Sequence, residues 1–282
     1  MATRMPSITE LSGYVLEPLR EGADFTLFRG RQRGNPLPLL ALALNAEQPS
    51  PQGLRRIEHE YSLAAELDPE WAAKPLAITR HEGRTTLILT DPGGEPLDRV
   101  LERDLVGNHH QPFDLARALR IAIGLAKALA QVHRHGLIHK DIKPANVLVD
   151  DAGHVCLTGF GLASRLPRES QAPAPPEIIA GTLAYMAPEQ TGRMNRSIDS
   201  RSDLYSFGVT LYQMLTGALP LSAADPLEWV HCHIARQPIP PGDRAVVPEP
   251  VSSLTMKLLA KNAEERYQTA SGLEADLRRC LA

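Results

Sequence analysis

The sequence predicts an α+β fold in two lobes, with a strand-rich first third and a mainly helical remainder. Short apolar runs separated by turn residues fill residues 8–45. Apolar residues at helical spacing dominate residues 115–133 and recur near the C-terminus in 254–261 and 270–281. With 282 residues and a hydrophobic fraction of 43%, the chain is long enough to bury a core in each lobe.

Three strands and one helix are expected first. The strands are 14–16, 26–29 and 39–44, with turns at 20–25 and 31–36. The run 39–44 is apolar throughout and follows two prolines, which favours a strand over a buried helix. A helix is expected at 51–67.

The rest of the chain supplies mostly helices. A strand at 85–90 must end at Pro92-Gly93-Gly94. Helices are expected at 97–105, at 115–133 with Asp114 as N-cap, and from Asp203 to about residue 215. Short apolar strands are expected at 147–149 and 155–157.

Charge and cysteine content exclude several classes of protein. The formal net charge is −3, so no strong field calls for nucleic acid or a membrane surface. Cys156, Cys232 and Cys280 are scattered and predict no disulfide framework, as is typical of a reducing cytoplasm. The N-terminus has no signal-peptide pattern, and no run of 18 apolar residues is present.

The stretch His139–Asp150 carries the strongest signal of chemistry. Asp141 is suited to accept a hydroxyl proton, Lys143 to neutralise a transferring phosphoryl group, and Asn146 to hold a metal ion. The order H-[RK]-D-x-K-x-x-N resembles the catalytic loop of eukaryotic-type Ser/Thr protein kinases. The resemblance implies a bilobal protein-kinase-like domain over residues 8–282, with a small lobe at about 8–90, a hinge at about 90–94 and a large lobe at about 95–282.

Further motifs match the family in the same order. Gly159-Phe160-Gly161 stands where kinases have D-F-G, residues 181–189 resemble the substrate-side loop and A-P-E motif, and Asp203 opens D-x-x-S-x-G. The resemblance implies a structural set that holds the fold: His139, Phe160, Glu189, Asp203 and Arg266. Residues 181–196, 230–238 and 256–268 resemble in particular the N-terminal kinase module of large bacterial proteins that continue into an ATPase module and a sensor histidine kinase.

The nucleotide side departs from the family pattern. The glycine-rich positions are Arg20, Gly22 and Phe25. The third-strand lysine aligns with Leu42, and residues 1–73 contain no lysine; Gly159 replaces the aspartate that binds Mg²⁺. Arg29 is the candidate for a relocated cation. Glu60, the candidate helix glutamate, is expected either in solvent or in a salt bridge with an arginine.

The resemblance also implies a nucleotide pocket and possible modification sites. The candidate ATP-binding set is Gly22, Leu27, Leu40, Leu89, Thr90 and Leu148, and Leu40 is expected to fill part of the adenine slot. Ser164, Ser170 and Thr182 are candidate phosphoacceptors, with unmodified surface hydroxyls favoured. His231-Cys232-His233 is not expected to bind zinc, because adjacent ligands on a helix diverge.

Three functions remain open. The preferred hypothesis is a pseudokinase that acts as a signalling or regulatory binding module, with a protein partner, no nucleic acid and no membrane. One alternative is an active kinase that transfers the ATP γ-phosphate using relocated charges. Another is a nucleotide-binding switch without transfer. ATP and Mg²⁺ are expected to bind weakly or not at all, and restoring lysine at 42 with aspartate at 159 is expected to recover some transfer.

Overall fold

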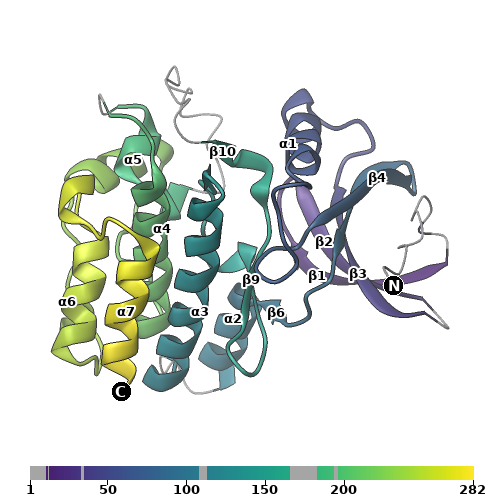
Figure 1. The fold of residues 1–282 in the computed structure, drawn as a ribbon. Coiled ribbons are helices and arrows are strands. Elements are labelled where there is room, and N and C mark those ends of the chain that lie inside the picture. Colours follow the sequence, from purple (N-terminus) through teal and green to yellow (C-terminus); the bar gives the residue numbers. More distant parts are fainter. Residues whose placement is uncertain (1–10, 12, 33–34, 108–112, 166–182, 194–195) are drawn as a thin grey trace.

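Two lobes of different composition make up the computed structural model, which describes residues 11, 13–32, 35–107, 113–165, 183–193 and 196–282. The small lobe, on the right of Figure 1, is an antiparallel sheet with one helix beside it, and the large lobe, on the left, is mainly helical. This confirms the α+β, kinase-like fold class predicted from the strand and helix patterns. No helix in the described ranges is long and apolar enough to cross a bilayer.

The small-lobe sheet has five strands in the order β1-β2-β3-β5-β4. These strands are β1 (Tyr14–Glu21), β2 (Phe25–Gln32), β3 (Asn35–Leu44), β4 (Pro75–His81) and β5 (Arg84–Thr90). The strand prediction for residues 39–44 is confirmed, since Leu42 pairs with Leu27 on one side and Leu87 on the other. The turn predicted at 20–25 is shorter than expected, because Arg20 still belongs to β1.

The single helix of the small lobe, α1 (Pro51–Ser62), ends before residue 67, where the sequence placed its end. Ser50 caps it by accepting a hydrogen bond from the Gly53 amide at 3.1 Å. The helix carries Glu60 on its buried face, and its His59 Nε2 lies 2.6 Å from the Ala163 carbonyl oxygen. Helix α1 is thereby fixed to the segment that follows Gly159-Phe160-Gly161.

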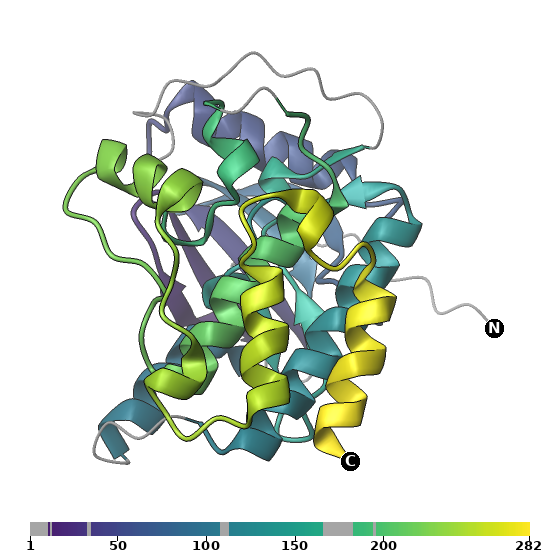
Figure 2. The ribbon, with the colours of Figure 1, turned by 90° about the vertical axis from the view of Figure 1, so that its left-hand side faces the viewer.

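The large lobe is built around the long helix α3 (Leu115–Arg134), with the Asp114 carboxylate accepting from the Arg117 amide as predicted. In Figure 2, helix α7 (Ala270–Leu281) lies beside α3. The other helices are α2 (Leu97–Gly107), α4 (Ser200–Thr216), α5 (Pro226–Ala235) and α6 (Glu249–Leu258). Helices α4 and α6 begin several residues earlier than expected, α4 because Asp199 rather than Asp203 provides the N-cap.

Short strands line the junction between the lobes. β6 (Glu95–Pro96), β8 (Val147–Val149) and β9 (Val155–Leu157) form a three-stranded sheet, and β7 (Leu137–Ile138) pairs with β10 (Ser164–Arg165). The strands at 147–149 and 155–157 confirm the sequence prediction. The loop that carries Asp141 and Asn146 runs from β7 to β8, which places it at the junction between the lobes.

Candidate functional site

The loop between β7 and β8 is supported from below by one buried carboxylate. Asp203, fully buried on α4, accepts from the His139 amide at 2.9 Å and from the Lys140 amide at 2.8 Å. His133 Nε2, near the end of α3, lies 2.9 Å from the same carboxylate. Neighbouring His133 and His139 hold the pKa of Asp203 below its usual value despite the opposing effect of burial. Asp203 therefore anchors the loop backbone, as its place in the structural set implies.

Two further supports come from the structural set predicted from sequence. Arg266 and Glu189 form a bidentate pair at 2.7 and 3.0 Å, with both side chains almost fully buried. The rings of His139 and Phe160 lie 4.5 Å apart between centroids, and neither residue is exposed. The ring contact fixes the start of the loop, and the buried ion pair joins distant segments of the large lobe.

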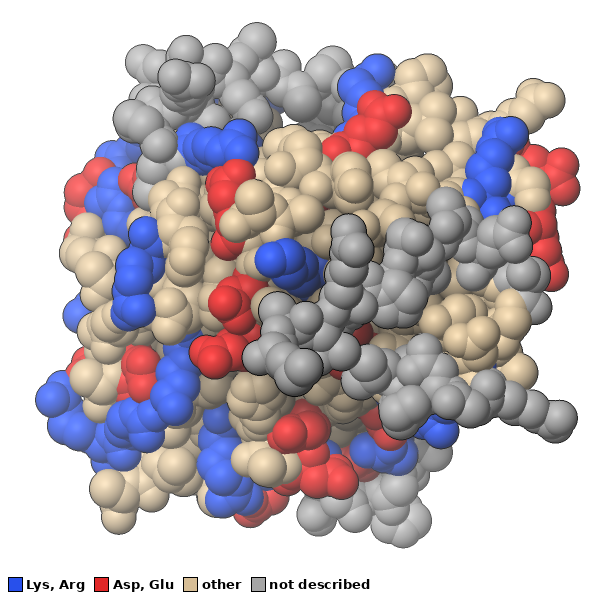
Figure 3. Space-filling view, turned by 45° about the vertical axis from the view of Figure 1, so that its right-hand side comes forward, with Lys and Arg blue, Asp and Glu red and all other residues tan. Residues whose placement is uncertain are grey.

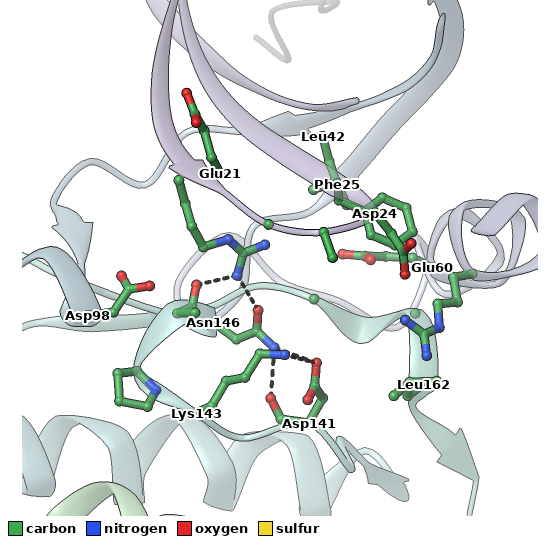
Figure 4. A pocket seen from close by; sticks show the side chains of 18 of the residues that line it. Glu21, Asp24, Phe25, Leu42, Glu60, Asp98, Asp141, Lys143, Asn146 and Leu162 are labelled. Carbon is green, nitrogen blue, oxygen red and sulfur yellow. Dashed lines mark hydrogen bonds and ion pairs between the residues drawn. The ribbon is translucent and has the colours of Figure 1, made fainter. Parts of the chain in front are cut away.

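The three predicted catalytic residues come together in one hydrogen-bonded group. Lys143 Nζ lies 2.9 Å from Asp141 Oδ2, and Asn146 Nδ2 donates to the same oxygen at 2.9 Å. Asn146 also donates to the Asp141 carbonyl at 2.7 Å. Figure 4 shows the group at the floor of a cavity, where the second oxygen, Asp141 Oδ1, is buried and has no partner in the described residues.

Arg20 reaches across the cleft from β1 and binds the catalytic loop. Its Nη1 donates to Asn146 Oδ1 at 2.7 Å and to the Ala145 carbonyl at 2.6 Å. Asn146 Oδ1 is the oxygen that the sequence offered to a metal ion. Burial lowers the pKa of Arg20, opposed by the negative charges of Asp98, Asp141 and Glu60. Arg20, which stands at a glycine position of the family pattern, therefore forms a polar link between the two lobes.

The predicted substitute cation, Arg29, does not reach the cavity. Its guanidinium binds the Asp91 carboxylate at 2.6 and 3.0 Å and the Gly94 carbonyl at 2.8 Å. The hypothesis that Arg29 replaces the missing lysine is therefore wrong, because all of these bonds go to the hinge.

Glu60 does not lie in solvent, and no arginine or lysine of the described residues forms a salt bridge with it. It is 2% exposed, and its Oε1 has no hydrogen-bond partner among the described residues. Burial raises the pKa of Glu60 to about 7, opposed by backbone hydrogen bonds from Phe160, Gly159 and Gly161 and by the charge of Arg20. Leu42 lines the same cavity and supplies no charge.

Most of the candidate ATP-binding set forms a core instead of lining a cavity. Leu27, Leu40, Leu89 and Leu148 are at most 1% exposed and belong to one hydrophobic cluster. Leu148 comes from the large lobe and the other three from the sheet, so this cluster joins the two lobes. Thr90 lies at the hinge, and its Oγ1 accepts a hydrogen bond from the Lys74 amide at 2.8 Å. Gly22 alone of the set lines the cavity described above.

Several other sequence expectations can be placed. Ser164 is not a surface hydroxyl, because its Oγ is buried, whereas Ser170 and Thr182 lie outside the described residues. His233 is buried on α5, with Nε2 2.6 Å from the Leu183 carbonyl oxygen and Nδ1 3.0 Å from the Tyr205 hydroxyl. In the described ranges no three His, Cys, Asp or Glu residues gather as metal ligands.

Acidic and basic side chains are interspersed over the face of the molecule in Figure 3, in keeping with the small net charge. No single sign of charge covers that face.

Known proteins with similar sequences are protein kinases. The family model of the protein kinase domain matches residues 40–277. Serine/threonine-protein kinase PknB of Mycolicibacterium smegmatis is 37% identical over 185 residues, which is 65% of this chain and 29% of the relative. PknB of Mycobacterium tuberculosis is 36% identical over 184 residues, covering 65% and 29%. Serine/threonine-protein kinase PksC of Streptomyces coelicolor is 35% identical over 205 residues, covering 71% and 36%. The match spans little more than a third of these relatives at most.

Proposed function

The chain belongs to the protein kinase domain family, of Ser/Thr type, and from that premise we propose that it is a pseudokinase: a kinase fold that serves as a signalling or regulatory binding module. One observation carries the proposal. Arg20 holds Asn146 Oδ1, the oxygen that would bind the metal, while the neighbouring position 159 has no side chain. The proposed protein partner and cytoplasmic location follow from the module's resemblance to bacterial signalling proteins.

The family generally uses ATP and Mg²⁺, but the residues present do not fit either group. The side chains that the resemblance assigns to adenine, Leu27, Leu40 and Leu148, are at most 1% exposed and belong to one packed cluster. A Mg²⁺ ion prefers charged oxygen ligands, and Asn146 Oδ1 is uncharged and already bonded to a guanidinium. We therefore derive no phosphoryl-transfer step for this chain.

The catalytic-loop side of the site keeps the residues that an active kinase would need. Asp141, Lys143 and Asn146 lie in one hydrogen-bonded group at the cleft. However, Lys143 and Asn146 together surround one oxygen of Asp141, and the other is buried. The arrangement supports a stable loop as readily as a proton acceptor, so the presence of these residues does not by itself argue for transfer.

Two measurements on the full chain test the proposal. In a radiolabel transfer assay with ATP and Mg²⁺ or Mn²⁺, we expect no Ser or Thr labelling above an Asp141→Asn control. In a thermal-shift titration, we expect ATP with metal to give much less than the roughly 2.7 kcal/mol that a ligand at a hundredfold its dissociation constant contributes.

Either opposite result would be decisive. Labelling that Asp141→Asn abolishes would establish an active kinase, and Arg20 would then be the cation to mutate first. Strong stabilisation by ATP without labelling would instead support the nucleotide-binding switch.

A further inference from the structure

Unpaired polar atoms gather around one cavity of the cleft. Among the described residues, four buried side-chain polar atoms lack a hydrogen-bond partner. Three of them, Glu60 Oε1, Asp141 Oδ1 and Arg56 Nε, belong to residues that line the same cavity of about 340 Å³. A buried polar group without a partner typically costs about 1–3 kcal/mol. Their concentration at one place therefore points to a ligand that supplies the missing bonds.

The charges lining this cavity favour a cation over an anion. Five carboxylates face it, against the three cations Arg20, Arg56 and Lys143; the carboxylates are those of Glu21, Asp24, Glu60, Asp98 and Asp141. A polyphosphate would meet this excess of negative charge without a metal ion to offset it.

The resident cations leave two acceptors open. Lys143 is bonded to Asp141 Oδ2, and Arg20 to Asn146 and the Ala145 carbonyl. Neither bond reaches Glu60 Oε1 or Asp141 Oδ1. Leu42 lines the cavity near Glu60 (Figure 4), but the leucine side chain has no hydrogen-bond donor. None of the described residues donates to either oxygen, so a bound group with two donors would satisfy both.

We propose that this cavity binds one arginine side chain of a basic peptide segment in a partner protein, with its guanidinium donating to Glu60 Oε1 and Asp141 Oδ1. A guanidinium carries five N–H donors in a planar fork, so one group is able to serve two carboxylates. The same peptide has carbonyl oxygens for Arg56 Nε, which a simple amine lacks. Tyr185, at the end of a short 3-10 helix (Leu183–Tyr185), also lines the cavity.

This inference rests on the proposed loss of phosphotransfer, because a bound nucleotide would compete for the same space. It adds the chemical class of the partner, which the pseudokinase proposal does not contain. The transfer assay and the binding assay below are independent. Labelling by the wild type would reject the pseudokinase, whereas loss of arginine preference would reject the binding site alone.

The test uses the full chain and fluorescent seven-residue peptides of glycine and serine with capped ends. One carries a central arginine, one citrulline, which has the same shape without the charge, and one lysine. We expect the wild type to bind the arginine peptide at least tenfold more tightly than the citrulline or lysine peptide. Equal affinity for the citrulline peptide would reject the site, and equal affinity for the lysine peptide would reject the guanidinium assignment.

Variants of the cavity provide matched controls. Leu42→Lys places an ammonium group beside Glu60 and should weaken the arginine peptide at least tenfold, while Leu42→Met keeps the bulk without the charge and should not. Glu60→Gln should weaken it similarly, without changing citrulline-peptide binding. Should either variant fail to fold by circular dichroism, Asp141→Asn removes the negative charge of the other acceptor at nearly the same shape. Unchanged arginine binding in the folded variants would overturn the proposal.

Discussion

Different forces stabilise the two sides of the cleft, which are the catalytic-loop side in the large lobe (the lower side) and the sheet side in the small lobe (the upper side). Below, charged side chains bind backbone and one another: Asp203 accepts two loop amides, and Glu189 pairs with Arg266. Above, buried leucines of the sheet hold the structure, and Leu42 sits among them at 8% exposure. The lower side needs its polar residues to fold, whereas the sheet above is equally well filled by an apolar side chain at position 42.

This difference explains which kinase features the chain keeps. Asp141, Lys143 and Asn146 are bonded into the loop, so they contribute to the fold whether or not phosphate is transferred. A lysine at position 42 or an aspartate at 159 would serve mainly the nucleotide. Loss of chemistry on the upper side is therefore compatible with an intact fold.

The largest effect expected is on the lower side. Arg266→Ala would leave Glu189 buried and unpaired, and we expect it to lower the free energy of unfolding by about 3–5 kcal/mol. Arg279→Ala, which removes an exposed pair with Asp276, is the control and should cost less than about 1 kcal/mol. Urea denaturation measures both. Similar losses in the two variants would contradict the claim that buried charges hold this side.

The stability of the small-lobe side should fall as pH rises, because the buried carboxyl of Glu60 has no cation bonded to it among the described residues. Burial raises the folded-state pKa of Glu60 to about 7, above the ordinary value of 4.5. Its contribution to stability is present below pH 4.5 and is lost as pH rises through about 7. The loss between pH 5 and 8 is about 2–3 kcal/mol. Glu60→Gln should remove it, and parallel wild-type and variant curves of unfolding free energy against pH would show that Glu60 does not titrate this way.

The smallest effect concerns repair of the upper side. The sequence predicted that Leu42→Lys with Gly159→Asp would recover some transfer, but a Cβ at position 159 would lie 2.8 Å from the Asn146 side chain, which Arg20 holds in place. We expect the double variant to stay at background. Adding Arg20→Gly should raise radiolabel transfer at least about tenfold, equivalent to about 1.4 kcal/mol. Equal transfer by the double and triple variants would mean that Arg20 is not the obstacle.

Much of the site was predictable because its signals are local. The order of residues 139–149 fixes a loop followed by a strand, and the structure gathers Asp141, Lys143 and Asn146 there. Long apolar periodicity likewise predicted α3 and α7 within a residue or two. The ends of α1, α4 and α6 were less well predicted, because caps and tertiary contacts decide where a helix stops.

By itself, the sequence determined the fold class and the absence of a lysine and an aspartate at positions 42 and 159. It could not determine what fills the vacated space. Arg20 and Asn146 are 126 residues apart and Arg29 and Asp91 are 62 apart, so which arginine enters the cleft depends on how β1 and β2 lie over the large lobe. Only the tertiary structure decided that Arg20 meets the catalytic loop, that Arg29 turns to the hinge, and that Glu60 is buried without a cation bonded to it. Local patterns specify elements, but the pairing of charges depends on packing between segments distant in the chain.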